Sequence, residues 1–218
     1  MKKIILTILF SIIFMLKANA DVTPQYLSSV VHFGIGVAQI DKNIKIYERP
    51  DVNSKMQAQI IWDEKGDLFC KNTKMKCEAK DIFLGFAPSN NAAILSVEDE
   101  NNEWINVCYN QRHRLFGWVK KSEYTKYLSW GEFLISYGKK YGMYLFRDVP
   151  KEYKRLYSAP DNESACVDSF FLATHIEPWL MRGNWILVKV ENYDDKQKTG
   201  WLRFRGDDGR FFGFVNLK

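Results

Sequence analysis

The sequence predicts a mainly β protein: two small β modules in tandem, joined by a segment with one short helix. The first observation is a repeated turn, Tyr47-Glu48-Arg49-Pro50-Asp51 with Ser54 and Tyr157-Ser158-Ala159-Pro160-Asp161 with Ser164. The second is a repeated strand pattern, Trp104-Ile105-Asn106-Val107 ahead of Gly117-Trp118 and Trp185-Ile186-Leu187-Val188 ahead of Gly200-Trp201. Self-similarity of this kind indicates duplicated structural units.

The chain begins with features of an export signal. Lys2 and Lys3 precede an apolar run from Ile4 to Leu16, and the small residues of Ala18-Asn19-Ala20 follow. We therefore expect a signal peptide over 1–20, a mature chain starting at Asp21, and a periplasmic or secreted protein. The apolar run is shorter than the roughly 20 residues that span a bilayer, so no transmembrane anchor is expected.

The two copies differ in length, which predicts an insertion in the first. Tyr47 precedes Trp104 by 57 positions, whereas Tyr157 precedes Trp185 by 28. We expect a first module over 21–123 with an insertion near 60–92, a connecting segment over 124–150, and a second module over 151–218. In the first module, Ile105, Val107 and Tyr109 share one strand parity and are expected to face the core. Ile186, Val188 and Val190 are the corresponding residues of the second module.

Four cysteines suit an oxidising compartment. Cys70 and Cys77 flank a polar stretch with turn character, so they are predicted to form a disulfide within the insertion. A zinc site is the competing interpretation, but a single pair at this spacing gives it little support. Cys108 and Cys166 lie in different copies, and the sequence leaves open whether they pair or remain thiols.

The connecting segment carries one helix signature. Ser129 and Glu132 form a capping box, Leu128 and Phe133 stand at staple positions, and Gly138 is placed where a helix would stop. A helix over about 130–137 is predicted, with another strand as the rival. In either form its apolar side chains are expected to pack against both modules.

Charge argues against nucleic acid as a partner. Loss of the signal removes three lysines and no acid, which leaves 28 basic against 26 acidic residues and a net charge of about +2. A protein with nearly equal numbers of basic and acidic residues lacks the excess of positive charge that favours binding to nucleic acid or anionic lipid.

The repeated elements together resemble the bacterial SH3-like domain, known as SH3b. The resemblance lies in an alternating strand that enters a Pro turn, a Trp-x-x-Val strand and a closing Gly-Trp strand, over about 36–122 and 142–216. It implies two small, strongly bent SH3-like β-barrels that bind peptides or cell-wall material without chemistry. The strands Ile44-Lys45-Ile46-Tyr47 and Arg155-Leu156-Tyr157 depart from the family's usual first strand.

Few residues suggest catalysis. The histidines, His32, His113 and His175, belong to no metal or nucleophile motif, and no cofactor or metal site is predicted. A Cys-dependent hydrolase is a remote alternative, with Cys108 and His113 or Cys166 and His175 as its pairs. Adjacent acids such as Asp207-Asp208 are typical of turns. We therefore expect no enzyme.

Aromatic residues give the best candidate site. Trp104 and Trp185 open their strands on the outward parity, so with Tyr47 and Tyr157 they are predicted to line a ligand-binding surface. Packing at the ends of the modules is the alternative. The predicted function is a non-catalytic envelope binding or adaptor protein that recognises peptidoglycan or an envelope protein or peptide. A protein–protein interaction or inhibitor protein acting through the disulfide-clipped insertion is the second possibility.

Overall fold

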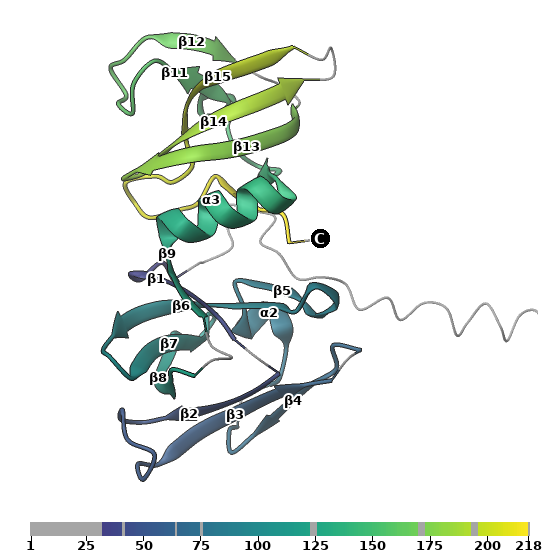
Figure 1. Cartoon of the computed structure of the whole chain (residues 1–218), viewed down its shortest axis with the longest axis vertical. Coiled ribbons are helices and arrows are strands. Elements are labelled where there is room, and N and C mark those ends of the chain that lie inside the picture. The colour runs from purple at the N-terminus through teal and green to yellow at the C-terminus, as the bar shows by residue number, and fades with distance from the viewer. Residues whose placement is uncertain are drawn as a thin grey trace, which may run out of the picture.

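The computed structural model describes residues 32–40, 42–63, 65–74, 76–122, 126–169, 173–192 and 196–217. The prediction of a mainly β protein is confirmed. Two β-rich halves lie along the long axis of the molecule, with helix α3 (Trp130–Tyr141) between them (Figure 1). The predicted export signal lies outside the described residues, and within those residues no helix has the length and apolarity to cross a membrane.

The first half contains one antiparallel sheet of nine strands. Their order is β4-β3-β2-β8-β7-β6-β1-β9, and β5 pairs with β6 off this path. The strands are β1 (Gly36–Gln39), β2 (Asn43–Tyr47), β3 (Met56–Trp62), β4 (Leu68–Lys71), β5 (Gly85–Ala87), β6 (Ala92–Glu100), β7 (Trp104–Asn110), β8 (Leu115–Lys120) and β9 (Lys126–Ser129).

The second half has a five-stranded sheet in the order β12-β11-β15-β14-β13 and a separate pair, β10-β16. The strands are β10 (Met143–Leu145), β11 (Arg155–Tyr157), β12 (Cys166–Ser169), β13 (Ala173–Arg182), β14 (Trp185–Asn192), β15 (Gln197–Arg203) and β16 (Gly213–Val215). Two short 3₁₀ helices complete the described elements, η1 (Pro88–Asn90) in the first half and η2 (Lys151–Tyr153) in the second.

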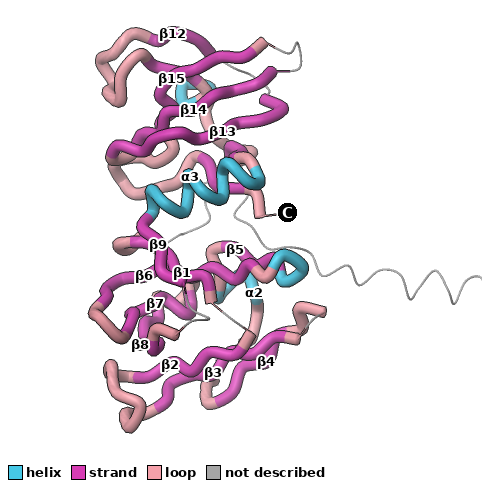
Figure 2. Tube along the Cα trace, in the orientation of Figure 1, coloured by secondary structure: helices cyan, strands magenta, loops and turns pink. Residues whose placement is uncertain are grey.

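Strands make up most of both halves, on either side of α3 (Figure 2). The order β3-β2-β8-β7-β6 corresponds to β12-β11-β15-β14-β13. The pair β1-β9 corresponds to β10-β16, although β1 also pairs with β6 whereas β10-β16 forms a separate sheet. Even the irregularities recur, because the register shifts directly before Tyr47 in β2 and before Tyr157 in β11. The repeat therefore extends from the sequence motifs to seven strands of each half.

Neither described sheet closes into the barrel that the sequence predicted. The hydrogen-bonded path of the first half ends at β4 and β9, and that of the second sheet ends at β12 and β13. Within each sheet the first and last strands of the repeated motif are joined by a narrow contact. β2 and β8 share a single residue pair, Tyr47 with Trp118, and β11 and β15 share only Tyr157 with Trp201.

A glycine permits this contact in both halves. A Cβ on Gly117 would lie 2.4 Å from Cγ2 of Ile46 and 3.1 Å from the carbonyl oxygen of Tyr47. A Cβ on Gly200 would lie 2.8 Å from Cβ of Leu156 and 3.2 Å from the carbonyl oxygen of Tyr157. The Gly-Trp motif is therefore a site of close approach between strands, which only glycine accommodates without a shift.

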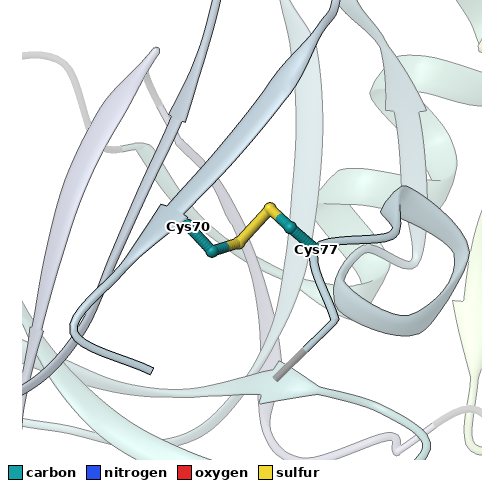
Figure 3. Close-up of a disulfide and its surroundings, with 2 residues drawn as sticks. All are labelled: Cys70 and Cys77. Atoms are coloured by element: carbon teal, nitrogen blue, oxygen red, sulfur yellow. A yellow bond between two sulfur atoms is a disulfide. The ribbon is translucent and has the colours of Figure 1, made fainter. Parts of the chain in front are cut away.

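The first half carries extra elements between β3 and β6. These are β4, the short helix α2 (Ala79–Ile82), β5 and η1. The predicted disulfide between Cys70 and Cys77 is confirmed, and it joins β4 to the residues ahead of α2, with 5.6 Å between the two Cα atoms (Figure 3).

Helix α3 confirms the predicted capping box but extends further than expected. The hydroxyl of Ser129 accepts a hydrogen bond from the backbone N–H of Glu132, whose carboxylate accepts one from the backbone N–H of Ser129. The expectation that Gly138 ends the helix is wrong. Gly138 is buried inside the helix, and a Cβ there would lie 2.2 Å from Cγ of Pro178 on β13.

Two hydrophobic cores stabilise the protein, and one of them joins the halves. The prediction that alternate residues of the two tryptophan strands face the core is confirmed. The fully buried residues are Ile105, Val107, Ile186, Val188 and Val190. The first core lies within the first half. The second core combines α3 and the strands of the second half with side chains from β1, β5 and β6; among its members are Val37, Ala87, Ile94, Phe133, Leu134, Ile186 and Phe214. The connecting helix thus packs against both halves, as predicted.

Candidate functional site

The same turn follows Tyr47 in the first half and Tyr157 in the second. The hydroxyl of Ser54 donates to the carbonyl oxygen of Arg49 at 3.1 Å, and that of Ser164 donates to the carbonyl oxygen of Ala159 at 2.9 Å. Carboxylates complete the turns, because Asp51 accepts from the backbone N–H two residues later at 2.9 Å and Asp161 does so at 2.7 Å. These bonds fix the turn against the strand that carries the tyrosine.

Each tyrosine meets the predicted tryptophan partner edge to face. The ring centroids of Tyr47 and Trp104 are 5.7 Å apart, and those of Tyr157 and Trp185 are 5.3 Å apart. Both tryptophans are buried, at 6% and 8% exposure, which favours the packing alternative for these two residues. Tyr47 and Tyr157 are half-buried and keep part of their rings at the surface. The ligand-binding role of the four residues stays a prediction.

A basic residue lies opposite each tryptophan. Lys120 is the cross-strand partner of Trp104, and Arg203 is the partner of Trp185. The guanidinium carbon of Arg203 lies 5.8 Å from the Trp185 ring centroid, within the range of a cation–π contact. Sequence reasoning missed this pair of cations, although each follows its Gly-Trp motif by two residues.

A pocket of about 220 Å³ lies where β2 and β8 separate in the first half. The two strands pair at Tyr47 and Trp118, and beyond this pair they diverge toward Asn43 and Ser122. The pocket is lined by Asn43, Ile44, Lys45, Tyr47, Val52, Val119, Lys120 and Ser122. Of the four predicted aromatic residues, Tyr47 is the one that contributes to this lining.

The corresponding place in the second half has a different chemistry. Arg203 donates from Nη1 to the side-chain oxygen of Asn162 at 3.0 Å, and its Nη2 pairs with a carboxylate oxygen of Asp207 at 2.6 Å. The hydrogen bond from Arg203 lowers the pKa of Asp207. Asn162 stands at the turn position that Val52 holds in the first half. Arg203 is thus tied to the turn and to the loop after β15.

The remaining cysteines do not assemble a nucleophile site. Cys108 is buried, its thiol donates to the carbonyl oxygen of Asn110 at 3.4 Å, and burial raises its pKa to about 11. Cys166 is exposed, and its thiol donates to the carbonyl oxygen of Asp168 at 3.3 Å. The two cysteines form no disulfide. Within the described residues, no group of three or more histidine, cysteine, aspartate or glutamate side chains is placed to hold a metal ion.

Comparison with known proteins adds no identification. No protein-family model matches the chain, and no curated protein matches it with significant similarity.

Proposed function

We propose that the protein is a non-catalytic, exported binding or adaptor protein of the cell envelope that recognises peptidoglycan or an envelope peptide. The two halves are proposed to be degenerate SH3b-like modules. The pocket beside Tyr47 carries the proposal, because it combines an aromatic face, aliphatic walls and a few polar groups, the usual composition of a recognition site.

The repeated strand order supports the assignment to SH3b-like modules. Each half presents a first strand, a Pro-Asp turn and a closing Gly-Trp strand in contact with one another, which are the elements that carried the resemblance in the sequence. The disulfide is consistent with an oxidising, exported environment.

The state of the thiols supports a binding role over hydrolysis. A catalytic cysteine needs an accessible thiolate. Cys108 is buried with a raised pKa, and among the described residues no histidine or basic side chain contacts the exposed Cys166, whose thiol donates to the carbonyl oxygen of Asp168.

Retention on purified cell wall tests the proposal. The mature chain from Asp21 is expected to sediment with peptidoglycan, and Tyr47→Ala is expected to weaken retention by about 2 kcal/mol. Because Tyr47 also packs on Trp104, retention is measured where circular dichroism shows that the variant is folded. Tyr157→Ala is the matched control in the second half. Trp104→Ala is expected to lower the free energy of unfolding by about 3–5 kcal/mol, because the indole is buried.

Absence of sedimentation, under conditions where circular dichroism shows a folded chain, would refute wall binding. If Tyr47→Ala and the unmodified chain are retained equally, the pocket beside Tyr47 is not the binding site.

A second candidate function is protein–protein interaction or inhibition through the disulfide-clipped insertion. Phe69 favours it, since this large apolar side chain is 53% exposed on the edge strand β4, next to Cys70. An exposed aromatic on an unpaired strand edge is a common contact element. Capture of a specific envelope protein by the unmodified chain but not by Phe69→Ser would support this function over wall binding.

A further inference from the structure

We infer that the pocket of the first half is a carboxylate site for the free carboxylates of cell-wall stem peptides, and that the corresponding place in the second half is not. This inference rests on the proposed function and specifies its ligand. Its starting point is the lining of the pocket, which among the described residues holds two lysines, Lys45 and Lys120, and no acidic residue.

Both lysines are available to a ligand. Each side chain is exposed, and within the described part of the chain neither ammonium group has an ion-pair or hydrogen-bond partner. Lys45 comes from β2 and Lys120 from the end of β8, so the two strands that border the pocket each contribute one lysine to its lining. A carboxylate between them gains charge-assisted hydrogen bonds, which are stronger than those between neutral groups.

The duplicated half shows the same arrangement with a carboxylate already supplied. Arg203 occupies the position of Lys120, and its guanidinium is paired with Asp207 and bound to Asn162. In the first half the turn position of Asn162 is held by Val52, whose side chain is 53% exposed and cannot accept a hydrogen bond. The internal carboxylate of Asp207 thus marks where a ligand's carboxylate is expected beside Lys120.

The size of the pocket limits what enters it. About 220 Å³ is smaller than the roughly 300–1,000 Å³ of sites that enclose a whole small molecule. The pocket therefore suits one terminal group of a longer chain. Ile44, Val52 and Val119 provide an aliphatic wall for a small side chain such as the methyl group of alanine, and Tyr47 provides an aromatic edge.

The experiment compares cell wall with wall whose carboxylates have been converted to amides. The unmodified chain is expected to sediment with untreated wall and to lose about tenfold in affinity on amidated wall. Lys45→Gln and Lys120→Gln are each expected to weaken binding to untreated wall by about tenfold, the effect of one charge-assisted hydrogen bond. Retention is also expected to fall as salt is raised.

Matched control variants test whether binding depends on the lysines of the pocket or on any exposed positive charge. Arg155→Gln removes the exposed cation at the position equivalent to Lys45, and Lys139→Gln removes an exposed cation from α3. Both are expected to retain full binding. A soluble pair, diacetyl-lysyl-D-alanyl-D-alanine and its C-terminal amide, gives a second readout, because the free acid is expected to bind about tenfold more tightly than the amide.

The outcomes distinguish this inference from the proposed function. Equal binding to untreated and amidated wall, or unchanged binding by both lysine variants, would overturn the carboxylate site while wall recognition stands. If Arg155→Gln weakens binding to cell wall as strongly as Lys45→Gln does, the inference that only the first half binds the carboxylate is overturned. Failure to bind either form of wall would refute the proposed function itself, and the inference with it.

Discussion

Replacement of Gly138 by alanine tests how the connecting helix joins the two halves. In an ordinary helix interior, Gly→Ala stabilises a protein by about 1 kcal/mol. Here the new Cβ would lie 2.2 Å and 2.8 Å from two ring carbons of Pro178 and 3.3 Å from Cγ of Met143. The proline ring is rigid, so α3 and β13 must move apart. Overpacking of this kind costs about 1–3 kcal/mol. Because the approach to the rigid ring is as close as 2.2 Å, we take the upper part of this range, about 2–3 kcal/mol, and subtracting the gain of about 1 kcal/mol leaves a net loss of about 1–2 kcal/mol.

Gly131 provides a control in the same helix. A Cβ on Gly131 would have its nearest neighbours, two atoms of Met181, at 4.0 Å, which is ordinary contact. Gly131→Ala is therefore expected to be neutral or to stabilise the protein by up to about 1 kcal/mol. If Gly138→Ala lowers the free energy of unfolding and Gly131→Ala does not, the difference reports packing, because both substitutions change helix propensity in the same direction.

Thermal and denaturant unfolding of both variants measure the difference. For a chain of this size, 1 kcal/mol corresponds to roughly 2–4 °C in Tm, so Gly138→Ala is expected to melt roughly 2–8 °C lower. If Gly138→Ala is as stable as Gly131→Ala, the close contact between α3 and β13 does not constrain the fold, and the reasoning fails.

Three further predictions concern the thiols and one ion pair. Replacement of Cys70 and its partner by serine is expected to cost about 2–3 kcal/mol, measured by denaturant unfolding, because the disulfide closes a short loop. Alkylation of native protein near pH 8 is expected to label Cys166 and spare Cys108, as peptide mapping will show; rapid labelling of Cys108 would contradict its burial. A hydrogen bond from Lys76 is the main cause that lowers the pKa of Glu78 to about 2. The Lys76–Glu78 interaction stabilises the folded state fully above the ordinary carboxyl pKa of about 4.5, and this stabilisation is lost as pH falls through about 2. Lys76→Met is therefore expected to raise the pKa of Glu78 in an NMR titration.

Local signals in the sequence predicted local structure well. The disulfide between Cys70 and Cys77 followed from a polar turn between two thiols, and the start of α3 followed from the capping box at Ser129. Strand parity predicted which side chains form the cores. Each of these features depends on residues within a few positions of one another, or on a period of two along one strand.

Features that depend on distant partners were not predictable. Parity placed Trp104 away from the core, but it carries no information about Tyr47, which packs on that second face. Gly138 has the composition of a helix stop, whereas its role is set by Pro178, forty residues later. The pocket escaped prediction for the same reason, since it is formed where two strands from opposite ends of the first module diverge.

The duplication separates residues that maintain the scaffold from residues that distinguish the two halves. The Tyr–Trp contacts, the serine and aspartate of the turns and the glycine before the last tryptophan are the same in both copies, and each has a structural contact that explains it. Val52 and Lys120 differ from their counterparts Asn162 and Arg203 at positions that face the same gap. These two differences, among others between the copies, change the side chains that face the gap, while the shared contacts keep the same strand order in both halves. Function is therefore best sought where the copies differ, at the mouth of the pocket between β2 and β8.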